Sequence, residues 1–130
     1  MFSKISTAQS GGVSDTLAYL HTIVANKAQY IGQPFSVLYS ALQIQIKFFN
    51  PNANLHYDKT KETSTAFSFY FPKTADEIYL AYPMLQITWQ FFLDAVLSNI
   101  LYTQHNGGGW GTAVYNFYKN AIIADITIRQ

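Results

Sequence analysis

The chain has 130 residues, of which 49% are hydrophobic, 17% aromatic and 12% charged. This length and hydrophobic content predict one globular domain, residues 1–130, and exclude an intrinsically disordered chain. A net charge of +1 offers no general attraction to nucleic acids or to anionic membranes. The absence of cysteine excludes disulfides, thiolate metal sites and thiol nucleophiles.

The N-terminal segment, residues 1–13, contains no apolar stretch of the kind found in signal peptides. We therefore expect it to form a loosely structured arm. Beyond it, apolar residues follow helical spacing from Leu17 to Ile31, with Ser14 as a candidate N-cap. This pattern predicts an amphipathic helix.

A second helix is predicted from Pro34 to Phe49, because proline suits a first helical position and the apolar residues keep helical spacing. Residues 42–48 also alternate between apolar and polar side chains, which is typical of a strand. We favour the helix, which with the first would form a helical hairpin.

The segment from Asn50 to Thr65 is polar and predicts a solvated loop, or an excursion over a neighbouring element. Its charged residues are Asp58, Lys59, Lys61 and Glu62. Residues 66–71 alternate aromatic and smaller side chains and end at Pro72, so they predict an extended, strand-like piece.

Thr74 and Glu77 have the spacing of a capping box, which predicts a short helix ending before Pro83. Residues 84–102 then carry one apolar stripe at helical spacing and one narrow polar stripe that includes Asp94. Such a mostly apolar circumference is typical of a buried helix. The polar interruptions argue against a membrane-spanning helix in this segment, and no stable membrane span is predicted.

Residues 107–111 are glycine-rich and predict a flexible or closely packed joint, and Thr112 begins a last helix. Two helical hairpins, residues 14–49 and 74–125, therefore predict an all-α fold, a subunit resembling a four-helix bundle. The alternative is an α+β fold with short strands near residues 66–71 and 122–128, because the second segment is rich in β-branched residues.

No motif in the chain carries a reaction. His21, His56 and His105 lie on different predicted elements without further ligands at metal-binding spacing, so no metal site is predicted. Asp94 could act as a general base, but its polar row fits a wetted or interhelical stripe better. We expect no catalytic residues, no cofactor and no enzymatic activity.

The distribution of charge predicts self-association. Asp94 is the single formal charge in the 41 residues from Ile78 to Tyr118, and one domain of this size cannot bury all of its aromatic side chains. We therefore predict a homo-oligomer or polymer held by apolar and amide contacts. The predicted interface residues are Trp89, Phe92, Val96 and Trp110.

The lysines are concentrated at the N-terminal side, with six of them in the first 73 residues. This local excess of positive charge predicts non-specific DNA contact through Lys4, Lys27 and Lys47. A single arginine in the whole chain argues against recognition of specific bases.

The chain is short, poor in charge, free of cysteine and rich in Tyr, Phe, Gln and Asn, with two predicted helical hairpins, an N-terminal arm and glycine joints. In this overall character it resembles the helical coat proteins of archaeal filamentous and spindle-shaped viruses. The resemblance implies a small helical capsid subunit that polymerises around DNA in a virion and has no catalytic residues.

Two other functions are compatible with the sequence. A small-molecule-binding or enzymatic α+β domain would use the two strand-like segments around an aromatic pocket. A membrane-peripheral accessory protein would use the apolar helix around Trp89 to contact lipid or a partner. A cytoplasmic location is the alternative to the virion.

Overall fold

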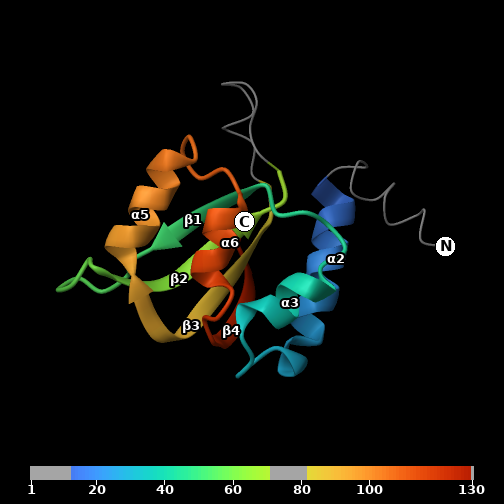
Figure 1. Ribbon diagram of the computed structural model, residues 1–130. Helices are drawn as coiled ribbons and strands as arrows, with labels where there is room; N and C mark the ends of the chain where they lie inside the picture. Colours follow the sequence, from blue (N-terminus) through green and yellow to red (C-terminus); the bar gives the residue numbers. More distant parts are fainter. Residues whose placement is uncertain (1–12, 71–81, 130) are drawn as a thin grey trace.

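The computed structural model describes residues 13–70 and 82–129, which form an α+β fold (Figure 1). Four strands make one antiparallel sheet in the order β1-β2-β3-β4. The strands are β1 (Phe48–Asn52), β2 (Lys61–Ser68), β3 (Met84–Asp94) and β4 (Ile123–Arg129). The helices are α2 (Val13–Ala25), α3 (Phe35–Ala41), α5 (Ala95–Gln104) and α6 (Thr112–Tyr118), with a 3-10 turn η1 (Lys27–Gln29). The predicted all-α bundle is therefore wrong, and the α+β alternative is the observed class.

The largest error of the sequence analysis concerns residues 84–102, which were predicted to form one buried helix. Residues up to Asp94 form β3, and only Ala95–Gln104 are helical. Leu85, Ile87 and Trp89 alternate with exposed or half-buried polar residues and are themselves buried. Because β3 pairs with β2 on one side and β4 on the other, hydrogen bonding across the sheet overrides the helical spacing of its apolar residues.

The helix predicted from Pro34 to Phe49 ends at Ala41, so the prediction is wrong for the second half of this segment. Residues 42–47 form neither helix nor strand, and β1 begins at Phe48, although Ile44 and Ile46 are buried while Gln43, Gln45 and Lys47 are exposed. Phe49 is fully buried on β1, where it pairs with a phenylalanine of β2.

Several predicted elements are confirmed. Both strand-like segments overlap strands, although β2 begins five residues before the segment 66–71 and ends at Ser68. The first helix ends at Ala25 and leaves Ile31 outside it, while the last helix begins at Thr112 as predicted. The N-terminal arm before Val13 and the capping box of Thr74 and Glu77 lie outside the described residues.

One face of the sheet carries the hydrophobic core. The register places Phe49, Phe67, Leu85, Ile87 and Ile126 on this face, and all five are buried. Buried residues of α2, α3 and α6 join them in a single cluster, and Figure 1 shows α6 over the sheet between α5 and α3. The helices therefore form one layer on this face.

Aromatic rings fill much of this layer. Phe35 of α3 stacks on Phe67 with ring centres 4.9 Å apart, and Trp89 stacks on Tyr118 of α6 at 5.7 Å. Trp110 lies edge-on to Phe67 at 5.7 Å. These rings contact one another in the region where the α+β alternative would place an aromatic pocket.

Candidate functional site

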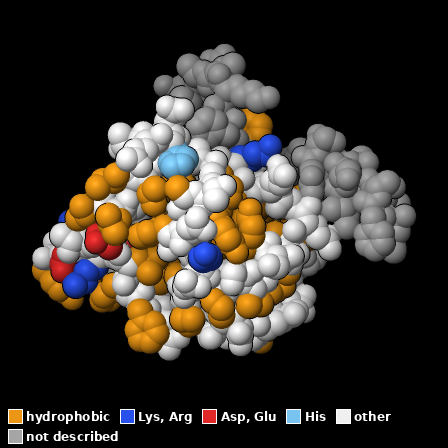
Figure 2. All heavy atoms as spheres, viewed as in Figure 1, with side chains coloured by type: hydrophobic (Ala, Val, Ile, Leu, Met, Phe, Trp, Pro, Cys, Tyr) orange, Lys and Arg blue, Asp and Glu red, His pale blue; other side chains and the backbone are white. Residues whose placement is uncertain are grey.

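A group of exposed hydrophobic side chains lies where β3 passes into α5. Each is between 47% and 66% exposed, and we call the group the α5 surface: Phe91, Phe92, Val96, Leu97 and Ile100. Figure 2 shows hydrophobic side chains reaching the surface over α5, at the left of the view. Isolated exposed hydrophobic residues are common, but five within ten positions indicate a binding surface.

An irregularity in β3 exposes the two phenylalanines. Thr88 pairs with Ser64 and Leu93 pairs with Glu62, so β3 has four residues between these pairs where β2 has only Thr63. Residues 89–92 therefore bulge out of the regular pairing with β2, although Trp89 still pairs with Ile123 of β4. Trp89 stays buried, whereas Phe91 and Phe92 are directed to the solvent.

The helix that follows also exposes large apolar side chains. Ala95 and Ser98 are the buried residues of α5, while Val96, Leu97 and Ile100 are exposed. An amphipathic helix ordinarily buries its large apolar residues against the core. In α5 the small residues Ala95 and Ser98, together with the half-buried Leu101 and Tyr102, face the core, whereas Val96, Leu97 and Ile100 remain available for a partner.

Asp94 fixes the start of this helix. Its carboxylate accepts hydrogen bonds from the backbone N–H groups of Val96 at 2.9 Å and Leu97 at 3.2 Å. This is an N-cap, which satisfies donors that the first turn leaves free. The predicted polar stripe through Asp94 does not exist as a helical feature, because its first members, Gln86 and Gln90, lie on β3.

Two shallow hollows flank Val96 and extend the surface with mostly uncharged groups. One is lined by Thr60, Lys61, Phe92, Leu93 and Asp94, and the other by Asn99, Ile100, Thr103 and Gln104. Lys61 forms an ion pair with Asp58 at 3.6 Å. The rim therefore consists largely of hydroxyl and amide groups, which both donate and accept hydrogen bonds.

The structure separates the four predicted interface residues into two pairs. Phe92 and Val96 lie together on the α5 surface, but Trp89 is buried and Trp110 is half-buried in the aromatic layer. Trp89 therefore contributes to the core of this chain and not to its exposed surface. Phe91, Leu97 and Ile100 are exposed residues of this surface that the sequence pattern did not identify, although the small residues Ala95 and Ser98 between them were a usable signal.

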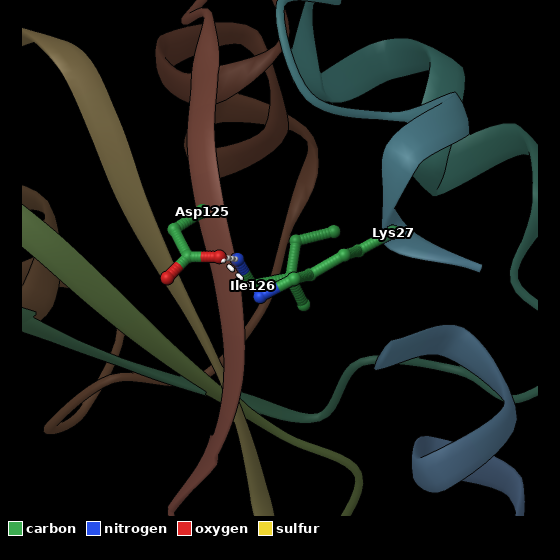
Figure 3. A network of polar contacts seen from close by, with 3 residues as sticks. All are labelled: Lys27, Asp125 and Ile126. Carbon is green, nitrogen blue, oxygen red and sulfur yellow. Dashed lines mark hydrogen bonds and ion pairs between the residues drawn. The ribbon is translucent and has the colours of Figure 1, made fainter. Parts of the chain in front are cut away.

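Of the lysines predicted to contact DNA, Lys27 is held in an ion pair. Lys27 donates to the Asp125 carboxylate at 2.7 Å (Figure 3), and the same oxygen accepts from the backbone N–H of Ile126. These two hydrogen bonds lower the pKa of Asp125. Lys47 is exposed, and Lys4 lies outside the described residues.

A buried polar cluster lies between the sheet, α5 and α6, and it overturns the prediction that Glu62 belongs to a solvated loop. Glu62 is 0% exposed on β2, and its Oε2 atom accepts hydrogen bonds from the Thr65 hydroxyl and, at 2.7 Å, from the Tyr118 hydroxyl. Its Oε1 atom has no hydrogen-bond partner among the described residues. Burial raises the pKa of Glu62, although the hydrogen bonds from Thr65 and Tyr118 partly oppose this.

The histidines offer no common site. Nδ1 of His105 is 2.8 Å from the Leu101 carbonyl oxygen at the end of α5, His21 lies on α2, and His56 lies in the loop before β2. Within residues 13–70 and 82–129, no cluster of three or more metal-binding side chains is present. In the same residues no helix has the length and hydropathy needed to cross a membrane.

Comparisons with protein-family models, with characterised protein sequences and with solved structures found no match for this chain.

Proposed function

We propose that the protein is a structural subunit that associates with copies of itself through the α5 surface. The observation that carries this proposal is the exposed apolar side of α5: Leu101 and Tyr102 pack against the core, while Val96, Leu97 and Ile100 of the same helix are exposed. Burying these side chains and the neighbouring phenylalanines against a partner would stabilise the complex by the hydrophobic effect.

A second copy of the chain fits this surface for electrostatic reasons. Asp94 is the one charged residue from Phe91 to Gln104, and its carboxylate is already bonded to the backbone of α5. Two such surfaces can therefore approach without strong repulsion between like charges. Rim amides such as Asn99 and Gln104 carry donors and acceptors, so they can pair with themselves across a two-fold axis.

A lipid surface is a weaker candidate for the partner. Peripheral membrane proteins commonly place several basic residues around the apolar side chains that enter the bilayer. Among the residues lining the two hollows, Lys61 is the one basic side chain, and Asp58 is its ion-pair partner. Anionic headgroups would gain little from this arrangement.

The wider role we propose is that of a coat subunit in a virion. The low charge, the absence of cysteine and the abundance of aromatic and amide side chains support it. The observed α+β fold removes the helical part of the resemblance to archaeal virus coat proteins. The proposed coat role therefore rests on composition, whereas the proposed self-association rests on the α5 surface.

Light scattering after size-exclusion chromatography tests this proposal. The mass of the wild-type protein should exceed the monomer mass of 14.7 kDa. The Phe92→Lys and Ile100→Lys variants should have the monomer mass, because each places a charge in the contact. Val37→Lys is the matched control, since Val37 is a similarly exposed apolar residue on α3. Circular dichroism establishes that each variant is folded.

Two results would overturn the proposal. One is a monomeric wild-type protein at high micromolar concentration. The other is a monomer that sediments with anionic phospholipid vesicles and loses this binding in the Phe92→Lys variant, which would identify the α5 surface as a lipid contact. A loss of association in Val37→Lys alone would place the contact on α3.

A further inference from the structure

We propose that Glu62 is a pH-sensitive site beneath α5: its protonated form stabilises the packing of the helix on the sheet, and its ionisation destabilises that packing. The effect on α5 itself does not depend on self-association. Its consequence, that rising pH weakens assembly, rests on the proposed function.

The geometry around Glu62 favours a neutral carboxyl group. The side chain is fully buried, and one of its two oxygen atoms has no hydrogen-bond partner among the described residues. Its neighbours in the cluster are hydroxyl groups from three elements, Thr65 of β2, Tyr118 of α6 and Ser98 of α5. A buried carboxylate without a cation is costly, because neutral donors replace only part of its hydration.

The charged and titratable groups of the surrounding elements do not supply that cation. Lys61, next along β2, is exposed and pairs with Asp58. Asp94 of β3 caps α5, while α5 contributes only Tyr102 and, at its end, His105. On α6 the titratable side chains are Tyr115 and Tyr118, and burial beside Glu62 raises the pKa of Tyr118, which therefore stays neutral. The described part of β1 has no titratable side chain.

Glu62 is well placed to act on α5. Ser98, fully buried on the inner side of the helix, faces the carboxyl group, and Ala95 donates its backbone N–H to the Thr60 carbonyl at 2.8 Å. Leu93, just before the helix, pairs with Glu62 across the sheet. When α5 separates from the sheet, water reaches the carboxyl group, and its ionisation then favours the separated state.

The direction in which pH changes the packing of α5 on the sheet follows from proton linkage. We call the state with α5 packed on the sheet closed, and the state with α5 separated from it open. Burial raises the pKa of Glu62 in the closed state, so the closed state holds the proton more tightly than the open state. The closed state is most favoured below the ordinary glutamate pKa, and it loses this advantage as the pH rises through the raised value. Within that window the opening equilibrium can grow by up to about tenfold per pH unit.

Amide hydrogen exchange of residues 95–104 tests the proposal. Exchange is measured from about pH 4 to about pH 9 at concentrations where the protein is monomeric, for the wild type, Glu62→Gln and Asp58→Asn. Comparison of proteins at one pH removes the intrinsic pH dependence of exchange. The wild-type to Glu62→Gln ratio of exchange rates in α5 should rise with pH, whereas the wild-type to Asp58→Asn ratio should stay level.

A second reference is available within the wild-type protein itself, if Glu62→Gln does not fold. The exchange of α5 amides relative to those of residues 84–88 in β3 should also increase with pH. A ratio that is constant with pH in both comparisons would overturn the proposal. A pH-dependent α5 in a protein that never associates would retain this inference and reject self-association.

Discussion

The indole nitrogen of Trp89 donates a hydrogen bond to the hydroxyl oxygen of Thr65 at 2.8 Å, across the two central strands. The Thr65 hydroxyl in turn donates to Glu62. On its other side the Trp89 ring stacks on Tyr118, which also donates to Glu62. One tryptophan therefore contributes both to the packing of the core and to the support of the buried carboxyl group.

Substitutions of Trp89 should separate these two contributions. We expect Trp89→Ala to lower the free energy of unfolding by about 3–5 kcal/mol, because it leaves a cavity in the aromatic layer. Trp89→Phe keeps a ring and removes the N–H donor, so its cost should be about 1–2 kcal/mol. Urea unfolding followed by far-UV circular dichroism measures both values. Equal costs for the two variants would mean that the ring itself contributes little.

Two neighbouring glycines should respond differently to alanine. Both have positive φ angles, +86° at Gly107 and +107° at Gly108, which cost a residue with a side chain about 1–2 kcal/mol. A Cβ atom at Gly107 meets open space, but at Gly108 it would lie 2.6 Å from the Phe48 ring and from the Phe49 carbonyl oxygen. We expect Gly108→Ala to cost roughly 3 kcal/mol or more, measured by the same unfolding experiment. Similar costs at both positions would argue against close packing at Gly108.

The stability of the whole protein should depend on pH through Glu62. Since the pKa of Glu62 is raised by burial, the folded state binds more protons than the unfolded state between the two pKa values. Stability from this residue is complete below the unfolded pKa and is lost as the pH rises through the folded one. The free energy of unfolding of Glu62→Gln minus that of the wild type should therefore grow with pH and then level off.

Unfolding by urea at a series of pH values measures this difference. Asp58 and Asp125 have lowered pKa values, because hydrogen bonds from Thr60 and Lys27 stabilise their ionised forms. Their contributions are lost as the pH falls, but they are common to both proteins and cancel in the comparison. A difference that does not vary with pH would show that Glu62 is ionised in the folded state as readily as in the unfolded one.

The sequence predicted the local signals of the fold better than its architecture. The alternation of aromatic and smaller side chains identified the strand near residues 66–71, and β-branched residues identified the one near residues 122–128. In β3, Leu85 and Trp89 are four residues apart, a spacing that a helical stripe and one face of a strand share. Pairing with β2 and β4 decides between the two periods, and such distant contacts cannot be read from a short window.

The candidate site, like the fold, could be predicted only in part from the sequence. An apolar segment containing Phe92 and Val96 was recognised as significant, but which of its side chains are exposed depends on the bulge in β3. Glu62 stands in a charged run that is typical of a solvated loop. The packing of α5 and α6 over β2 encloses its carboxyl group, and no local pattern predicts that packing.

Self-association through the α5 surface should resist salt. Screening weakens contacts between exposed charges, whereas hydrophobic contacts are unchanged or strengthened by many salts. We therefore expect the mass measured by light scattering to persist to about 1 M NaCl. Dissociation at high salt would indicate that charged residues outside the α5 surface hold the copies together.

Chemical cross-linking tests the central claim most directly, because the wild-type chain contains no cysteine. Ile100→Cys places one thiol on the α5 surface, and Val37→Cys places one on α3 as the matched control. With a short bis-maleimide reagent, Ile100→Cys should give a covalent dimer in high yield at concentrations where the protein associates, whereas Val37→Cys should associate but give little covalent dimer. Equal yields from the two variants, or no dimer from Ile100→Cys in an associated sample, would contradict the assignment of the α5 surface as the contact between copies.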